Sequence, residues 1–292
     1  MHLFVQALIL GVLIGGIYAL MASGLTLVFG IMRVINVAQG AMVILGAYLS
    51  YSLFRAAHLD PFVSILLITP AMFALGVGIH RLFIRSLRGE SAEEMSLLVT
   101  WATALAVEGA LSVTYTTTYR STITSYAQHS WVVFGYRIAE VRVFGFLISV
   151  AILVALSLLL ARTRFGRSVR ATVQNPTSAK LLGVNADRVS ALGFGIGVAT
   201  AAAAGAVFGM IYPFNPGSHY DLISRLLSIV VLGGLGSIGG AVVAAMILGV
   251  AESVVAVMIS PIWAPFVFFV VLIAILVVRP QGLFGVRERG SL

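Results

Sequence analysis

Residues 162–188 read RTRFGRSVRATVQNPTSAKLLGVNADR, the longest polar and basic interval in a sequence that is otherwise mostly apolar. The interval holds five arginines and the only lysine of the chain, Lys180, against a single acid, Asp187. Long apolar segments lie on both sides of it. A segment of about 20 apolar residues is long enough to cross a bilayer as a helix. The sequence therefore predicts that residues 162–188 lie outside the bilayer, between two membrane-spanning helices.

The composition of the whole chain is that of a membrane protein. Of its 292 residues, 60% are hydrophobic and 10% are charged, and the mean hydropathy is +1.07. Soluble domains carry roughly 25% charged residues. The absence of cysteine excludes disulfides and thiolate metal sites, and the five histidines are too scattered to predict a metal site. We predict an all-α, polytopic integral membrane helical bundle, with residues 1–292 forming a single transmembrane domain.

The apolar segments predict about eight or nine crossings of the bilayer. A run at residues 223–258 is too long for one ordinary span, and glycines at 233–240 interrupt it, which predicts a turn or break. Broken or re-entrant helices are therefore expected too. The other apolar segments lie at residues 4–29, 36–54, 62–83, 95–115, 143–161, 189–212 and 263–279.

The net charge of +8 indicates orientation in the membrane rather than binding to nucleic acid. The arginines cluster at the ends of apolar segments, which is typical of cytoplasmic loops. The sequence contains no soluble basic domain that could bind nucleic acid. Nine crossings would place the N-terminus and residues 116–142 outside the cell. The basic groups expected in the cytoplasm are residues 162–188, Arg81 with Arg85 and Arg88, and Arg279 with Arg287 and Arg289.

Enzyme chemistry finds little support in the sequence. Because Lys180 is the only lysine and no G-x-x-x-x-G-K-[S/T] pattern surrounds it, we expect no nucleotide to bind through a P-loop of this chain. The string Gly234-x-Gly236-x-x-Gly239 matches a dinucleotide fingerprint but lacks the strand–turn–helix context, so we interpret it as a tight turn or helix contact. We predict no catalytic residue and no cofactor bound by the chain.

Two glutamates inside apolar segments are candidates for a substrate path. Glu108 lies deep in the fourth segment and Glu252 lies late in the glycine-interrupted run. Charge is costly at membrane depth, so each either lines a polar path or pairs with an interior partner. Arg225 is expected to extend its side chain toward the membrane interface.

A third candidate is the junction of the first two apolar segments, where Asn36, Gln39 and Gly40 lie. An interrupted helix at membrane depth would offer amide and backbone groups to a polar substrate. The alternative is an ordinary asparagine cap at a cytoplasmic turn. The residues alone do not decide between the two.

Residues 162–188 have the pattern of two short helices. Arg167, Arg170 and Gln174 recur on one helical face, with Val169 and Val173 on another. Asn175-Pro176 then ends this helix and starts a second, because asparagine caps helices and proline favours their first position. Gly183 is placed to end the second helix. This pattern favours an element on which a soluble partner docks, with a loop lying on lipid headgroups as the alternative.

At these residues the sequence resembles the permease subunits of branched-chain (hydrophobic) amino acid ABC importers, the LivH-like group. The similar motifs run in order along nearly the whole chain. They are GLTLVFG at 24–30, RVINVAQG at 33–40, RFGRSVRATVQNP at 164–176, LLGVN at 181–185, GGLGS at 233–237 and RPQGLF at 279–284. The sequence has Gln39 where family members often have histidine, Val37 where they often have phenylalanine, and Gly239 where proline is common.

This resemblance implies a multi-pass permease subunit of the bacterial inner membrane that lets substrate cross by alternating access. It implies a second, LivM-like permease, two cytoplasmic ATPases that use ATP and Mg²⁺, and an external or periplasmic solute-binding protein. Related permeases also serve urea and short-chain amides. A stand-alone secondary transporter or channel, and more weakly a membrane enzyme, are alternatives of other classes.

The resemblance also implies that residues 162–188 form the loop that couples the permease to its ATPase. The predicted coupling residues are Arg164, Phe165, Gly166, Arg167, Arg170, Ala171, Gln174, Asn175, Pro176, Lys180, Leu181, Leu182 and Gly183.

Overall fold

The computed structural model describes residues 2–87, 92–124, 126, 129–133, 135–279 and 281–284. Arg88, Arg287 and Arg289, expected in cytoplasmic loops, lie outside these residues. The elements are α1 (His2–Met32), α2 (Gln39–Ala57), α3 (Pro61–Ile79), the π-helical turn η1 (His80–Ile84), α4 (Ala92–Tyr115), β1 (Ser130–Val133), β2 (Tyr136–Ala139), α5 (Glu140–Arg162), α6 (Arg164–Gln174), α7 (Pro176–Leu181), α8 (Ala186–Ile211), the 3-10 turn η3 (Pro216–Ser218), α9 (His219–Gly233), α10 (Ile238–Met258) and α11 (Phe266–Val278).

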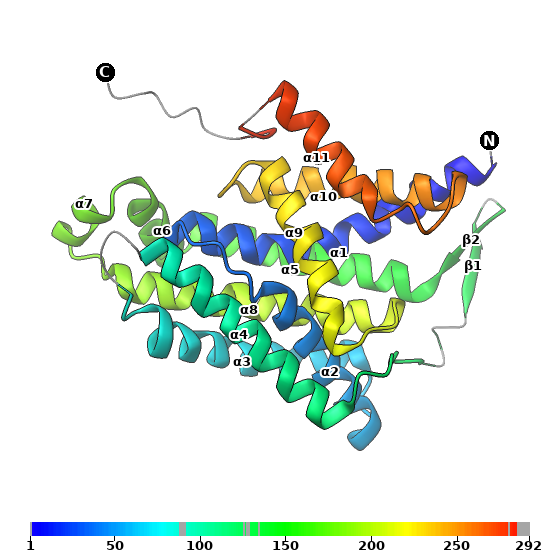
Figure 1. Cartoon of the computed structure of the whole chain (residues 1–292), viewed down its shortest axis with the longest axis horizontal. Coiled ribbons are helices and arrows are strands. Elements are labelled where there is room, and N and C mark those ends of the chain that lie inside the picture. Colours follow the sequence, from blue (N-terminus) through cyan, green and yellow to red (C-terminus); the bar gives the residue numbers. More distant parts are fainter. Residues whose placement is uncertain are drawn as a thin grey trace.

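The long helices form a bundle with two distinct ends. Helix α1 packs against α5, α8 and α10, and these helices run side by side in Figure 1. Helices α6 and α7 lie at one end, which we call the α6–α7 end. The antiparallel pair β1–β2 lies at the opposite end beside the N-terminus, which we call the hairpin end. The helical bundle predicted from composition is confirmed, with this short hairpin added.

Seven helices of the described residues are long and apolar enough to cross a membrane. The predicted break in residues 223–258 is confirmed, because α9 ends at Gly233 and α10 begins at Ile238. Helices α9 and α11 have 15 and 13 residues. At 1.5 Å per residue they are about 22 and 20 Å long, short of the roughly 30 Å hydrocarbon core. The eight or nine predicted crossings therefore depend on two short helices.

The centre of the bundle is built from small residues that bring helix backbones into contact. Residues 199–206 of α8 are almost all alanine and are buried against α1, α2 and α3. A Cβ atom on Gly205 would lie 1.9 Å from the carbonyl oxygen of Val43 in α2. A Cβ on Gly11 would similarly lie 2.5 Å from the Cα of Val250 in α10. These glycines therefore allow close contacts between helix backbones, as small residues do in membrane helix packing.

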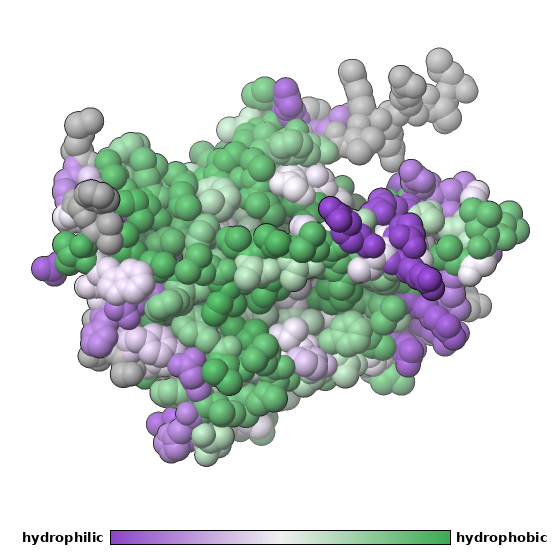
Figure 2. Space-filling model, turned by 180° about the vertical axis from the view of Figure 1, so that it is seen from behind, coloured by the Kyte–Doolittle hydropathy of each residue, from purple (hydrophilic) through white to green (hydrophobic). Residues whose placement is uncertain are grey.

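The outer surface carries large apolar side chains over most of its area. Figure 2 shows one face of the molecule. Hydrophobic side chains cover its broad centre, and a group of hydrophilic side chains lies toward the α6–α7 end. Side chains such as Leu66, Val113 and Val277 are more than half exposed along the helices. Such a surface is suited to lipid rather than water. The chain is a multi-pass membrane protein.

Candidate functional site

Two short helices meet at a corner at the α6–α7 end, with the break at Asn175-Pro176 and the stop at Gly183 that the sequence predicts. Helix α6 begins after Thr163, whose Oγ1 accepts a hydrogen bond from the Gly166 amide at 3.2 Å. Helix α7 begins after Asn175, whose Oδ1 accepts one from the Ser178 amide at 3.0 Å. Gly183 follows α7 with φ of 83°, which glycine adopts at little cost. Local capping therefore sets the corner.

The inner face of α6 is fixed against the membrane helices. Gly166, Val169 and Thr172 are buried. Val173, predicted to share a face with Val169, lines the same cavity as Val169 but is 44% exposed. The two valines lie on one face of α6, and Val173 stands at the exposed edge of that face.

Further contacts tie α6 to its neighbours. The Arg170 guanidinium donates a hydrogen bond to the carbonyl oxygen of Leu160, near the end of α5, at 2.5 Å. Phe165 is half-buried against a small hydrophobic cluster that includes Leu27 and Ile31 of α1. A displacement of α6 therefore acts directly on α1 and α5.

The outer face of the corner is basic and also carries two solvent-exposed leucines. Leu181 and Leu182 are 84% and 82% exposed. Exposed leucines lying together are uncommon outside an interface. Ala171 is half-buried, and Pro176 is the first residue of α7. The predicted coupling residues that are exposed here are Arg164, Arg167, Arg170, Gln174, Asn175, Lys180, Leu181, Leu182 and Gly183.

The amides between α1 and α2 lie inside the bundle. The residue that caps α2 is Ala38, so the interpretation of Asn36 as a helix cap was wrong. Asn36 and Gln39 are fully buried and hydrogen-bonded at 3.2 Å. The Gln39 amide also donates to the carbonyl oxygens of Met21 at 3.3 Å and Gly197 at 3.1 Å, in the interiors of α1 and α8. Met21 is about 16 Å from the end of α1, so α2 begins deep in the bundle.

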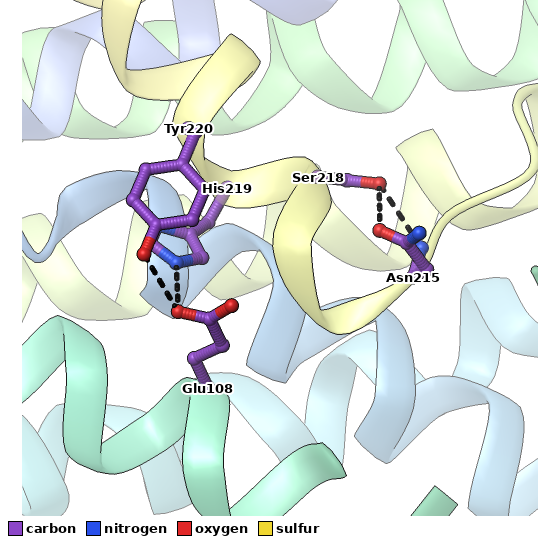
Figure 3. Close-up of polar contacts among 5 residues, drawn as sticks. All are labelled: Glu108, Asn215, Ser218, His219 and Tyr220. Atoms are coloured by element: carbon purple, nitrogen blue, oxygen red, sulfur yellow. Dashed lines mark hydrogen bonds and ion pairs between the residues drawn. The ribbon is translucent and has the colours of Figure 1, made fainter. Parts of the chain in front are cut away.

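Gly40 brings the start of α2 against the start of α9. A Cβ on Gly40 would lie 2.6 Å from the carbonyl oxygen of His219, the first residue of α9. The preceding turn η3 is closed by Ser218, whose Oγ donates to Asn215 Oδ1 at 2.9 Å and accepts from the Asn215 amide at 3.0 Å (Figure 3). Helix α9 therefore starts at a defined point beside α2.

Glu108 contacts the same end of α9. Its Oε2 lies 3.1 Å from His219 Nε2 and accepts a hydrogen bond from the Tyr220 hydroxyl at 2.9 Å. Figure 3 shows the carboxylate of α4 pointing toward both rings. His219 is buried, whereas Tyr220 is partly exposed. The glutamate predicted to pair or to line a path thus joins α4 to α9.

Glu252 also pairs with α9. Its Oε1 accepts a hydrogen bond from Arg225, which donates a second one to the Tyr18 hydroxyl at 2.7 Å. The Arg225 side chain, expected at the membrane interface, is only 19% exposed and lies inside, because an acid and a phenol are within its reach. The second carboxylate oxygen, Glu252 Oε2, is buried and has no hydrogen-bond partner among the described residues.

A cavity of about 540 Å³ adjoins this pair. Tyr119 and Arg142, near the hairpin end, line it together with Arg225 and Glu252, near the middle of α9 and α10. Helices α1, α8, α9 and α10 and the segment before α11 form its walls. The volume is in the range of small-molecule sites.

Three of the five predicted path residues, Gly40, Glu108 and Glu252, therefore contact α9, whereas Asn36 and Gln39 bond to each other and to α1 and α8. Gly40 and Glu108 contact the first turn of α9, and Glu252 contacts Arg225 two turns later. Sequence reasoning did not find His219 and Tyr220, because their partner Glu108 is 111 and 112 residues away. Their position next to Pro216-Gly217-Ser218, a helix-start pattern, was the available signal.

Comparison with known proteins finds similarity to permease components of branched-chain amino acid transport systems. A family model described as branched-chain amino acid transport system / permease component matches residues 7–276. The chain is 32% identical to the high-affinity branched-chain amino acid transport system permease protein LivH of Salmonella typhimurium, over 98% of this chain and 96% of the relative. The LivH protein of Escherichia coli gives the same values, and BraD of Pseudomonas aeruginosa is 31% identical over 98% and 97%. No solved structure matches the chain.

Proposed function

Because the chain belongs to the family of permease components of branched-chain amino acid transport systems, we propose that it carries branched-chain or related amino acids across a bacterial inner membrane as one subunit of an ATP-driven importer. The permease moves its substrate without altering it chemically. ATP and Mg²⁺ are used by separate subunits, since the sequence holds no P-loop of its own.

The observation that carries the proposal is the α6–α7 corner. Its inner face is packed on α1 and α5, while its outer face presents basic side chains around Leu181 and Leu182. An apolar anchor ringed by charge is the composition of a protein–protein interface. An acidic groove on a cytoplasmic ATPase would receive it. ATP-driven closure of two such ATPases would then move α6 and, through it, the membrane helices.

The remaining partners follow from the two ends and the lateral surface of the bundle. The hairpin end, opposite the basic corner, faces outward and receives an external solute-binding protein. A second permease, identical or LivM-like, completes the pathway, and lipid covers the rest of the apolar surface. The path follows α9, where the polar side chains of the bundle interior converge.

Reconstitution tests this proposal against its alternatives. The importer is assembled in proteoliposomes from this chain, its partner permease and two ATPases, and the loaded binding protein is added. Leucine uptake should occur only when ATP is present on the side of the membrane on which the ATPases lie. Uptake by this chain alone under an ion gradient, without ATP, would instead make it a secondary transporter. Retention of urea or a short-chain amide, and not leucine, by the cognate binding protein would reassign the substrate class.

A further inference from the structure

The cavity between α1, α9 and α10 has charges of both signs in its wall. Arg142 and Arg225 are cationic, and Asp221 and Glu252 are anionic, so the charged side chains that line it sum to zero. The rest of the wall is largely aromatic and aliphatic, including Tyr18, Tyr212, Phe208, Ile14, Leu222 and Val257. A neutral ligand such as urea needs no such charges, whereas a ligand with one positive and one negative group is matched by them.

A purely structural role is a poor explanation for the Arg225–Glu252 pair. Taking two charges out of water costs several kcal/mol per ion, and a buried ion pair often adds no more stability than apolar residues of the same volume. Ionised side chains at membrane depth are for this reason usually functional. One carboxylate oxygen, Glu252 Oε2, is moreover buried without a hydrogen-bond partner in the described part of the chain. Residue Glu252 lines the cavity and is 91% buried, so its carboxylate is held beside the cavity with one acceptor that the described residues leave unused.

The geometry points to this cavity as the binding site for the zwitterionic backbone of an α-amino acid. The Arg225 guanidinium takes the ligand carboxylate, and the Glu252 carboxylate takes the ligand ammonium. The aliphatic side chain of the ligand packs against Leu222 and Val257. The inference rests on the proposed function, since it locates the substrate of that transport inside this chain.

The cluster of Glu108, His219 and Tyr220 is a less suitable binding site for the same ligand. Its acceptor oxygen Oε2 is already engaged by His219 and Tyr220, and Glu108 does not line the cavity. Its nearby groups offer no cation comparable to Arg225. We therefore use the two locations as opposing outcomes of one experiment.

Photolabelling of the assembled importer separates them. The probe is a leucine analogue with a diazirine in its side chain, delivered by the binding protein and irradiated during turnover. We expect labelled peptides from α9 and α10 around Leu222 and Val257, with labelling abolished by excess leucine. Labelling confined to α4 or to other surfaces, or no labelling of this chain while uptake proceeds, would overturn the inference. Absence of leucine uptake altogether would instead refute the proposed function.

Two variants test the cavity independently of the probe. Ala256→Phe places a ring in the cavity wall, whereas Ile259→Phe adds the same ring just beyond the end of α10, at a residue that is outside the cavity and 70% exposed. The first should lower leucine uptake at least about tenfold, and the second should leave it unchanged. Equal uptake by both variants, at equal amounts of assembled complex, would overturn the inference.

The charges can be removed while the pair keeps its shape. The double variant Arg225→Gln, Glu252→Gln retains hydrogen-bonding side chains of similar size but loses both charges. Uptake of leucine should fall about tenfold or more, since hydrogen bonds to charged groups are the stronger class. Stimulation of ATP hydrolysis by the loaded binding protein should persist, which a merely misfolded permease could not support. Wild-type uptake by this double variant would contradict the proposed site.

Discussion

Removing the two exposed leucines of the α6–α7 corner should release the ATPase while leaving the permease folded. The change is Leu181→Ala together with Leu182→Ala. Both side chains are more than 80% exposed, so they contribute little to the stability of this chain and are free to insert into a partner. Burying a leucine that was exposed is worth about 1.5–3 kcal/mol.

The expected loss of binding free energy follows from this burial of the two leucines. Alanine retains one methyl group at each position, so the double truncation should remove about 2–4 kcal/mol from association with the ATPase. At 1.4 kcal/mol for each factor of ten, the dissociation constant should rise roughly 30- to 700-fold. This range corresponds to full burial of both leucines on docking, as for anchors at the centre of an interface.

The assay is a titration of ATPase onto immobilised, detergent-solubilised permease, with thermal unfolding of the same samples measured in parallel. The matched control is Ile123→Ala with Val132→Ala, two exposed apolar residues between α4 and β1 and in β1, which should bind the ATPase normally. Unchanged affinity in the leucine variant would refute the docking of α7. A large fall in the melting temperature of this variant would show that the two leucines stabilise the fold, which contradicts their high solvent exposure.

Three further predictions concern the same corner and the start of α2. Arg167→Glu, at an exposed position of α6, should weaken ATPase binding and reduce its dependence on salt, as measured by titration at low and high ionic strength. Gly40→Ala should cost about 1–3 kcal/mol of stability, because its Cβ would lie 2.6 Å from a backbone oxygen of α9. Gly109→Ala is the control, since a Cβ there meets nothing within 4 Å, and thermal unfolding compares the two variants. Gln39→Leu should cost about 1–3 kcal/mol in the same measurement, because it leaves the buried amide of Asn36 without its acceptor; an unchanged melting temperature would contradict this.

The spans and the corner could be predicted from sequence because both are local properties. A membrane helix is recognised by the length of its apolar run, and the predicted segment at 143–161 became α5 at 140–162. The corner is set by Asn175 and Pro176, which end α6 and start α7 through contacts with residues close to them in the sequence. No long-range contact is needed for either inference.

The pairing of polar groups could not be predicted, because it depends on which helices meet. Glu108 and Glu252 were recognised as costly charges, yet their partners on α9 were not. Arg225 was expected at the interface because a lone arginine in an apolar segment usually extends outward. In the fold it lies within reach of Glu252 and Tyr18, and these contacts outweigh that tendency.

The position of α9 explains how an event at the corner can reach the polar interior. The turn after α9 places Gly236 against Gly30 of α1, and both residues line a cavity of about 280 Å³ together with Val169 of α6. Near its middle α9 holds Arg225 beside Glu252. Close-packed interiors do not deform continuously, so a shift of α6 must be taken up by discrete rearrangement of the helices that share this cavity. A helix of 15 residues does not extend across the full bilayer thickness, so α9 can shift as a unit. We infer that α9 carries motion from the α6–α7 corner to the charged pair, since it is in contact with the surroundings of both.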